Sequence, residues 1–527
     1  MKYNLLFKNC RLIDGTGSPW RRADVGVKDG KIAFVGKGCA DSEAEETVDC
    51  GDFYLAPGFI DIHSHSDTTI FDYPAAESRI LQGVTTELGG DCGISAAPVS
   101  RDPEKKRLLA DYVGDLTYDW NSMGEFLDAV ENVKPSVNFA SAAGHGTLRI
   151  AAMGFDDRKP SEDEMETMKE LLSESLEDGA FCLSSGLIYP PGVFSATDEM
   201  AELCTVLNDY GAFYETHMRS ESGEVEEAVA EAIEVAKRAG VPLQICHHKI
   251  LREENWGKSG ATTEMIEKAR ERGLDVQCDQ YPYCASATSL DSNAPDWAFE
   301  GGVGALLGRL RDPETRKRIN EEVEKSHRGR WDKIVISSTA SEKFGWTVGK
   351  SIAEIAETRG VSCADACFDI VVDSGDRTGE INYGICEEEV EFIMKKPYVM
   401  TGSDGQAISL NYNGMPHPRN YGTFPRVIAH YARDRKLFTV EEAVRKMTAM
   451  PAARMGLSDR GLVKEGFMAD LVLFDLDSLE DTPTYDRPMT ACRGIKKVYV
   501  NGVLTAEEGA HTGARAGMVL RRGRKTK

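Results

Sequence analysis

Short strand patterns joined by tight turns occupy both ends of the chain. In residues 1–57, apolar and polar positions alternate in short segments, two of which flank Asp29-Gly30, a dipeptide typical of β-hairpins. In residues 462–527, an apolar run at 471–474 is followed by two further short segments around Asn501-Gly502. Because these β-rich ends flank a middle of different character, they predict a small sheet domain built from both termini.

The middle of the chain, residues 58–461, alternates between apolar runs of strand length and charged helical stretches. The run at 137–146, for example, is followed at 161–179 by a stretch with helical character that begins with acidic residues. Each strand–helix unit takes about 30–40 residues, a repeat typical of parallel α/β proteins. About eight such units fit the available length if the sheet closes into a barrel.

One segment of this middle region, residues 287–332, breaks the alternation with a mostly charged, helical stretch. The next apolar run comes only at 333–338. We interpret the segment as an insertion over one face of the barrel. It is either a solvated helical excursion or a lid that shapes access to the barrel.

Two histidines at the end of a predicted strand are the first residues with metal-ligand chemistry. His63 and His65 close the segment FIDIHSHSD at 59–67. Residues at positions i and i+2 of a strand face the same way, so the two imidazoles converge. A pair placed in this way indicates a metal site more strongly than a single histidine does.

A cysteine in a glycine-rich segment follows the next predicted strand. Cys92 lies among Gly89, Gly90 and Gly93, which allow the backbone to bring the sulfur close to a shared centre. Thiolate is a soft ligand that suits zinc. Cys92 alone would be interpreted as a buried thiol, but together with His63 and His65 it is interpreted as a metal ligand.

Later strand ends supply further donors. His217 ends one predicted strand, and His247 and His248 end the next. Adjacent residues on a strand face opposite ways, so only one of this pair can point into the barrel. Asp404 ends the predicted strand segment KPYVMTGSD, directly before Gly405. Three interpretations of Asp404 remain open, namely a general base, a metal ligand and a turn residue. Because active sites of such barrels lie at the carboxyl ends of the strands, these residues predict a catalytic metal site with an open position for water.

Composition narrows the class of protein. The net charge of −24 argues against a nucleic-acid or anionic-membrane surface, and 41% hydrophobic residues are ordinary for a globular protein. The N-terminus lacks the pattern of a signal peptide, and no apolar stretch is long enough for a membrane span. Thirteen scattered cysteines suggest reduced thiols. We therefore expect a cytoplasmic protein with a small-molecule partner, without nucleic acid or membrane, and leave a homo-oligomer open.

The sequence resembles the amidohydrolase superfamily and, within it, the D-aminoacylases (N-acyl-D-amino-acid deacylases). The matching segments run in order over nearly the whole chain: LAPGFIDIHSHSD, the Cys92 loop, LSSGLIYPPG, YETHMRSE, ICHHK, DQYPY, SDG and HPRNYGTFPRVI. The last segment is the most diagnostic. The resemblance implies an α/β fold, namely a TIM-like (β/α)8 barrel with a small β-sandwich formed from both termini, and a zinc cofactor.

The resemblance also implies how the metal site is divided. Cys92, His217 and His247 would hold a tightly bound zinc ion. A second, weaker metal position would share Cys92 and add the other donors, namely His63, His65 and Asp404. His248 would point away into packing. Many superfamily members bridge two metals with a carboxylated lysine; no lysine stands at the corresponding strand end, and Cys92 fits that bridging role.

The substrate of such an enzyme carries a free carboxylate, and the resemblance assigns three residues to it. Lys249 and Arg419 would supply positive charge and Tyr281 a hydrogen-bond donor. The chain has Ala287 where the family usually offers a serine, so that Ser286 or Ser289 would have to substitute. Asp91 stands where relatives often carry asparagine.

These features lead to one functional hypothesis and two alternatives. The hypothesis is zinc-dependent hydrolysis of N-acyl-D-amino acids, in which Asp404 takes a proton from water and delivers it to the leaving amine. A cyclic amidohydrolase of the dihydroorotase or hydantoinase type is the first alternative; the missing lysine and the HPRNYGTFPR segment count against it. The second is a non-catalytic scaffold on the same fold, against which the complete ligand set counts.

Overall fold

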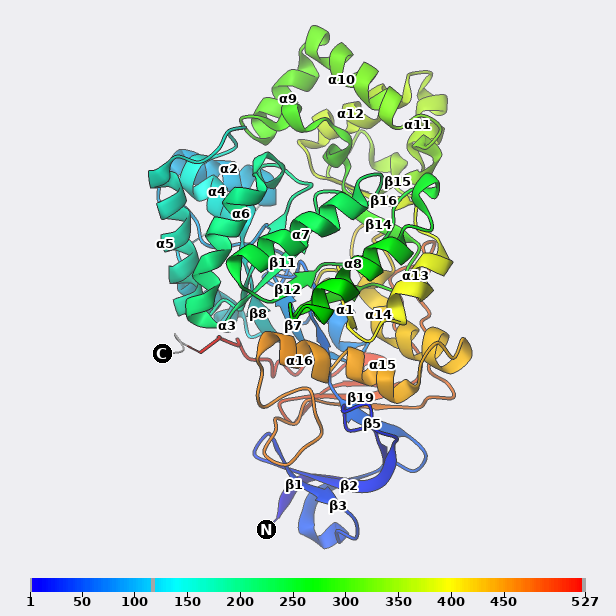
Figure 1. Ribbon diagram of the computed structural model, residues 1–527. Coiled ribbons are helices and arrows are strands. Elements are labelled where there is room, and N and C mark those ends of the chain that lie inside the picture. The colour runs from blue at the N-terminus through cyan, green and yellow to red at the C-terminus, as the bar shows by residue number, and fades with distance from the viewer. Residues whose placement is uncertain (1, 115–118, 524–527) are drawn as a thin grey trace.

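The protein is built from three parts that follow one another along its long axis (Figure 1). The computed structural model describes residues 2–114 and 119–523. A sheet from both termini lies at one end, a barrel in the middle, and a helical insertion with helices α9 to α12 at the other end.

Within the described residues, the terminal sheet contains nine strands, five from the N-terminal part and four from the C-terminal part. Their bounds are β1 (Tyr3–Leu12), β2 (Arg21–Lys28), β3 (Lys31–Gly36), β4 (Ala44–Asp49), β5 (Tyr54–Pro57), β18 (Leu471–Phe474), β19 (Ile495–Val500), β20 (Val503–Glu507) and β21 (Ala510–His511). The two parts join where β5 and β18 pair antiparallel. The prediction of one sheet domain from both termini is therefore confirmed.

Both predicted hairpins form where their turn residues require them. Asp29 and Gly30 have φ angles of 51° and 75° between the antiparallel strands β2 and β3. Asn501 and Gly502, at 50° and 81°, connect β19 to β20 in the same way. Two successive residues with positive φ make the turn that matches the twist of adjoining strands.

The barrel has eight parallel strands within the described residues. They are β6 (Phe59–Asp61), β7 (Val84–Gly89), β8 (Asn138–Ser141) with β9 (Ala143–Gly144), β10 (Cys182–Gly186), β11 (Phe213–His217), β12 (Leu243–Ile245), β13 (Val276–Gln280) and β17 (Val399–Thr401). Only Ala142 separates β8 from β9, and we count these two as one strand. A parallel bridge between Ser64 and Gly405 closes the ring and brings His63 next to Asp404, whose N–H donates to the His63 carbonyl over 2.9 Å.

Helices surround the barrel, as the strand–helix repeat predicts. They are α1 (Glu77–Ile80), α2 (Pro103–Val113), α3 (Met123–Val133), α4 (His145–Met153), α5 (Glu162–Asp178), α6 (Thr197–Cys204), α7 (Val225–Ala239), α8 (Ser259–Glu271), α13 (Glu387–Met394), α14 (Arg419–Arg426), α15 (Val440–Lys446) and α16 (Ala449–Met455). Helix α5 begins after Ser161, which forms a capping box with Glu164, and ends at Gly179. The helix predicted at 161–179 is thus present.

The insertion lies between β13 and β17 and is larger than the charged segment at 287–332. It comprises β14 (Ala285–Ser289), β15 (Ile334–Thr339), β16 (Thr378–Tyr383), α9 (Val303–Arg311), α10 (Pro313–Ser326), α11 (Ile352–Arg359) and α12 (Cys363–Ser374). The apolar run at 333–338 forms β15, which pairs with β16 and not with the barrel. A separate hydrophobic core that includes Leu306, Ile319 and Phe368 supports this unit.

The C-terminal segment leaves the terminal sheet and returns to the barrel. Val519 forms a parallel bridge with Phe139 of β8, and Phe139 exchanges backbone hydrogen bonds with Met518 and Leu520. The last described residues, up to Gly523, therefore lie beside α3 in Figure 1, where Arg521 pairs with Asp128 of that helix. These backbone contacts connect the C-terminal part of the terminal sheet domain to the barrel.

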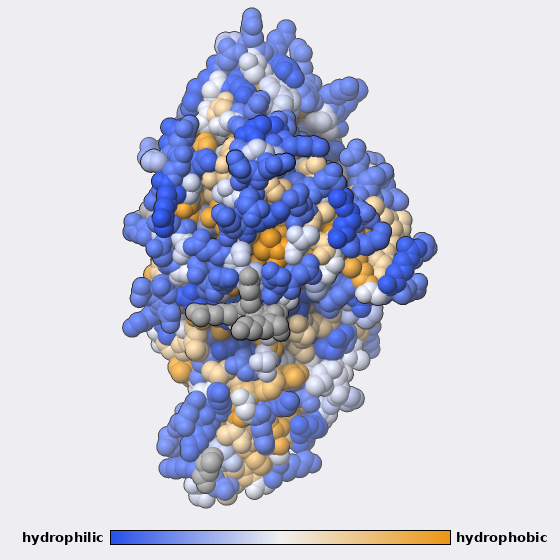
Figure 2. All heavy atoms as spheres, turned by 60° about the vertical axis from the view of Figure 1, so that its left-hand side comes forward, coloured by the Kyte–Doolittle hydropathy of each residue, from blue (hydrophilic) through white to orange (hydrophobic). Residues whose placement is uncertain are grey.

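One face of the molecule is mostly hydrophilic. On the face shown in Figure 2, apolar residues form separate spots among charged and polar ones. Among residues 2–114 and 119–523, no helix combines the length and the apolar character that a membrane span needs.

Candidate metal centre

A cysteine sulfur lies at the centre of the strand ends. The Cys92 Sγ is 3.4 Å from the His63 Nε2, 3.5 Å from the His217 Nδ1 and 3.3 Å from the His247 Nε2. The four residues come from four different strands, β6, β7, β11 and β12, or from the residues that follow them. The sequence prediction that these side chains converge at the carboxyl ends of the strands agrees with this arrangement.

The glycines beside Cys92 are needed for this position. Cys92 itself has a φ of 54°, and Gly90 and Gly93 have φ angles of 84° and 79°. A side chain at Gly93 would collide with the backbone of Ser185 and Gly186 on β10. Only a segment with glycine at these points can bring the sulfur this close to three imidazoles.

Asp404 faces the same centre from the loop that follows β17. Its Oδ1 is 3.0 Å from the His65 Nε2 and 3.6 Å from the His63 Nε2. Its Oδ2 accepts a hydrogen bond of 2.7 Å from the Arg419 Nη1. One carboxylate oxygen therefore faces the histidines while the other is held by a guanidinium.

These donors fit a zinc ion. Tetrahedral zinc with a thiolate at about 2.3 Å and an imidazole at about 2.05 Å separates sulfur from nitrogen by about 3.6 Å. The three distances from Cys92 lie just below that value. The potential ligand atoms of His63, Cys92, His247 and Asp404 also all lie within 4.8 Å of one another.

The protonation states suit metal binding. Burial lowers the pKa of His217 and His247 well below the usual value, and Lys249 lowers both further, so the two imidazoles are neutral. Burial opposes ionisation of Asp404, but Arg419 and the three neighbouring histidines His247, His65 and His63 together hold the Asp404 pKa well below its usual range. Burial and the charge of Asp404 raise the pKa of the Cys92 thiol well above its usual value. Cys92 therefore has to release a proton when a metal binds.

Two buried acids that the sequence interpretation did not assign lie behind the histidines. The Glu221 Oε1 is 3.0 Å from the His247 Nδ1, and its Oε2 is 3.5 Å from the His217 Nε2. The Asp279 Oδ1 is 3.3 Å from the His63 Nδ1 and accepts a hydrogen bond of 2.8 Å from the His247 N–H. Asp279 precedes the end of β13, so the strand-end rule could have found it; Glu221 lies in a loop without such a signal.

We expect Glu221→Gln to weaken metal binding about 10–100-fold, because carboxylates that hold ligand histidines contribute about that much. Competition between the purified protein and a zinc chelator measures this change. The matched control is Glu227→Gln, which removes an exposed carboxylate on the neighbouring helix α7. Equal zinc affinity in Glu221→Gln and wild type would show that Glu221 does not hold the ligands.

His248 turns away from the cluster. Its side chain is buried, and its Nε2 lies 3.0 Å from the Thr262 Oγ1 on α8. Of the two adjacent histidines, only His247 thus faces the barrel interior.

A cavity of about 780 Å³ opens onto the cluster. Cys92, His217 and His247 line it on one side, and Arg419 lines it as well. Of the two serines considered in place of the family's serine, Ser289 lines this cavity and Ser286 does not.

The three predicted carboxylate-binding residues cluster beside this cavity, although Lys249 and Tyr281 are not part of its wall. The Lys249 ammonium pairs with Glu221 and lies 2.8 Å from the His247 Nδ1. The Arg419 guanidinium lies 4.9 Å from the ring centre of Tyr281. Among the described residues, the Tyr281 hydroxyl and the Arg419 Nε are buried without a hydrogen-bond partner.

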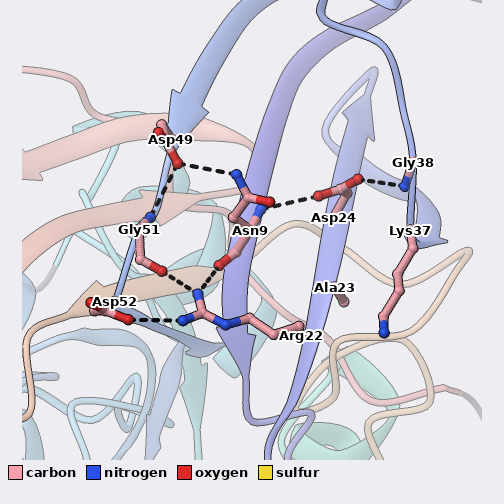
Figure 3. A pocket seen from close by; sticks show the side chains of 9 residues that line it. All are labelled: Asn9, Arg22, Ala23, Asp24, Lys37, Gly38, Asp49, Gly51 and Asp52. Atoms are coloured by element: carbon pink, nitrogen blue, oxygen red, sulfur yellow. Dashed lines mark hydrogen bonds and ion pairs between the residues drawn. The ribbon is translucent and has the colours of Figure 1, made fainter.

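A second cavity, of about 540 Å³, lies on the terminal sheet (Figure 3). Arg22 donates to the carbonyls of Asn9 and Gly51 and pairs with Asp52, while Asp24 accepts from the backbone of Asn9 and Gly38. The polar groups on its wall thus bind mainly one another, and we assign no function to it.

Comparison with known proteins places this centre in a family. An amidohydrolase family model matches residues 46–506. The D-aminoacylase of Alcaligenes xylosoxydans xylosoxydans is 37% identical over 99% of this chain and 98% of its own length. The N-acyl-D-glutamate deacylase of the same organism is 36% identical over 99% of this chain and 97% of its own length.

Solved structures give the same result. N-acyl-D-glutamate deacylase from Bordetella bronchiseptica, complexed with zinc and a phosphonate inhibitor, is 34% identical and superimposes with a TM-score of 0.84. A D-aminoacylase with a binuclear metal centre, in which one metal activates and the second attenuates, is 34% identical with a TM-score of 0.83. Both comparisons cover 99% of this chain and 100% of the other. The chain is therefore a metal-dependent amidohydrolase that belongs to the D-aminoacylase (N-acyl-D-amino-acid deacylase) family.

Proposed function

We propose that this protein hydrolyses the amide bond of N-acyl-D-amino acids and releases a carboxylate and a free D-amino acid. The observation that carries the proposal is the cluster in which Cys92 contacts three histidines beside the Asp404–Arg419 pair. Two of its relatives are named D-aminoacylase and N-acyl-D-glutamate deacylase, and these names support the D-configuration of the proposed substrate.

Zinc is the metal that fits these residues, and we propose that Cys92, His217 and His247 hold it. We further propose that a second, weaker metal would share Cys92 and use His63, His65 and Asp404. Zinc supplies Lewis-acid polarisation of a carbonyl and lowers the pKa of water. The cavity in front of the cluster has room for an acylated amino acid.

Asp404 acts as the general base and then as the general acid. Its Oδ1 points to the cluster, where it can accept a proton from water and donate it to the leaving nitrogen. Arg419 fixes the Oδ2 over 2.7 Å and keeps the carboxylate ionised and oriented until the proton arrives. The proton is thus held at one defined oxygen atom.

The substrate carboxylate binds near Arg419 and Tyr281 in this proposal. The buried Tyr281 hydroxyl and the Arg419 Nε have no partner among the described residues, and an anionic group would satisfy both. Lys249 adds positive charge from behind, 5.5 Å from the Tyr281 ring centre, although Glu221 neutralises part of it. An acyl group then extends toward the open side of the cavity.

Purified, zinc-loaded protein should hydrolyse N-acetyl-D-amino acids and leave matched N-acetyl-L-amino acids and a hydantoin unchanged. Release of the free amino acid, followed by chiral chromatography, measures both activity and stereochemistry. Turnover of only the L-substrates would refute the proposed stereochemistry. Turnover of only the hydantoin would favour a cyclic amidohydrolase, the alternative that the lack of a bridging lysine already disfavours.

A further inference from the structure

Asp404 has a backbone conformation that residues other than glycine seldom adopt. Its φ angle is 52°, in the left-handed region. Two backbone hydrogen bonds to the end of β6 hold part of it: the Asp404 N–H donates to the His63 carbonyl over 2.9 Å, and the His65 N–H donates to the Gly405 carbonyl over 2.8 Å. Because such a conformation persists only where its surroundings enforce it, the direction of the Asp404 carboxylate depends on the contacts of the adjoining residues.

Ser403, directly before Asp404, fixes the backbone on both sides of it. The Ser403 hydroxyl oxygen accepts a hydrogen bond of 3.1 Å from the Gly405 N–H. The Ser403 N–H donates to the Asp61 Oδ1 over 2.8 Å, and the Ser403 hydroxyl donates to the Asp61 Oδ2. The serine side chain therefore bridges the residues on either side of Asp404 and attaches them to a carboxylate at the end of β6.

Arg79 of α1 holds this arrangement with its guanidinium group. The Arg79 Nη1 donates to the Ser403 Oγ over 2.8 Å and to the Asp61 Oδ2 over 3.2 Å, and the Nε lies 3.3 Å from the Glu87 Oε2. These four side chains are completely buried. A β-carbon on Gly405 would come within 2.7 Å of the Arg79 Nη2, so the guanidinium packs directly against that glycine.

Ser78, the neighbour of Arg79 on α1, binds the next part of the same loop. The Ser78 hydroxyl donates to the Gln406 carbonyl over 2.9 Å and accepts from the Ile408 N–H over 3.0 Å. Two successive residues of α1 thus hold the loop that follows β17 at several points along its backbone.

Gln82, just after α1, holds the helix that carries Arg419. The Gln82 Nε2 donates to the Asn420 carbonyl over 2.8 Å, and the Gln82 Oε1 accepts from the Phe424 N–H over 3.2 Å. Asn420 directly follows Arg419 at the start of α14. The segment 78–82 therefore fixes both members of the Asp404–Arg419 pair relative to each other.

We propose that Arg79 is a positioning residue which, through Ser403 and Asp61, holds the Asp404 carboxylate where proton transfer requires it. The inference rests on the proposed deacylase function, in which Asp404 accepts a proton from water and delivers it to the leaving nitrogen. Arg79 is not among the described residues that line the cavity, so it acts on the reaction through the backbone around Asp404. A displacement of about 1 Å at a reacting group is enough to slow a reaction about 100-fold.

Replacement of the guanidinium should slow the chemical step while substrate and zinc still bind. We expect Arg79→Met, in which the apolar part of the side chain remains, to lower kcat about 100-fold with nearly unchanged KM and zinc content. Arg79→Lys, which restores the charge and N–H donors, should recover kcat at least about tenfold relative to Arg79→Met. Steady-state kinetics with N-acetyl-D-amino acids and metal analysis measure these values. Arg107→Met, which removes an exposed arginine on α2, is the matched control and should keep the wild-type kcat.

Ser403→Ala provides a second test, because Arg79→Met leaves the buried Asp61 and Glu87 without their cation, whereas the serine variant changes no charge. It should also lower kcat with little change in KM. The double variant should lose no more kcat than the weaker of the two single variants, because both substitutions break one network.

The outcomes separate the inference from the function on which it rests. A wild-type kcat in Ser403→Ala would overturn the inference and leave the proposed function intact. So would additive losses in the double variant, or a loss of zinc that accounts for the loss of kcat, since either result is expected of a general structural role. Absence of turnover of every N-acyl-D-amino acid by the zinc-loaded wild type would instead refute the proposed function, and the inference with it.

Discussion

Asp404→Asn is expected to keep its zinc and to lose turnover by about 10²–10⁴-fold, the contribution typical of a positioned general base. Asparagine has nearly the same shape, and its amide oxygen can still accept from the Arg419 Nη1, as the Oδ2 does over 2.7 Å. It cannot accept and release a proton at neutral pH. The loss should therefore appear mainly in kcat, with metal content unchanged.

Steady-state kinetics with metal analysis of the same preparation separate these effects. Asp111→Asn is the matched control, because Asp111 is an exposed acid on the wall of the same cavity, outside the cluster. It should change kcat less than tenfold. If fully zinc-loaded Asp404→Asn turned over at nearly the wild-type rate, Asp404 would be a ligand or an orienting group and another residue would serve as base.

The convergence of the site could be predicted because strand geometry dictates it. His63 and His65 share one face by the i, i+2 rule, and parallel strands bring the residues at their carboxyl ends to one rim. Cys92 could be added because only glycine-rich backbone allows the close approach that its φ of 54° shows. Each of these inferences depends only on local backbone geometry, which can be derived from the order of residues in the sequence.

The surroundings of the site could not be predicted, because they depend on contacts between loops. Glu221 reaches His217 and His247 from a loop with no periodic pattern. It also binds Lys249, which the family resemblance assigned to the substrate carboxylate. Pairing between such residues depends on loop conformation, which neither hydrophobic periodicity nor turn chemistry specifies.

The insertion illustrates the same limit for the fold. Its apolar run at β15 has the composition of a barrel strand, but it pairs antiparallel with β16 over a core of its own. An apolar composition indicates that a strand is buried, but it does not indicate to which sheet the strand belongs.

Cys92→Ala is expected to lower zinc affinity by roughly 1,000-fold or more, because it removes a direct ligand, whereas residues behind ligands contribute only about 10–100-fold. The Cys92 Sγ lies within 3.5 Å of a nitrogen of each of three histidines, and alanine has no donor atom at that position. Chelator competition and metal content per chain measure the loss. Cys204→Ala, which removes a buried thiol on α6 far along the chain, should leave zinc binding unchanged.

The pH dependence of binding distinguishes a lost ligand from a general disturbance of the barrel. Because the pKa of the Cys92 thiol is raised by burial and by Asp404, wild type should release one thiol proton when the first, tightly bound zinc binds. Its zinc affinity should then rise about tenfold per pH unit below that pKa. Cys92→Ala should lose this part of the slope, whereas a variant that only loosens the fold should keep it. Tight zinc with an unchanged slope in Cys92→Ala would move the strong site to His63, His65 and Asp404.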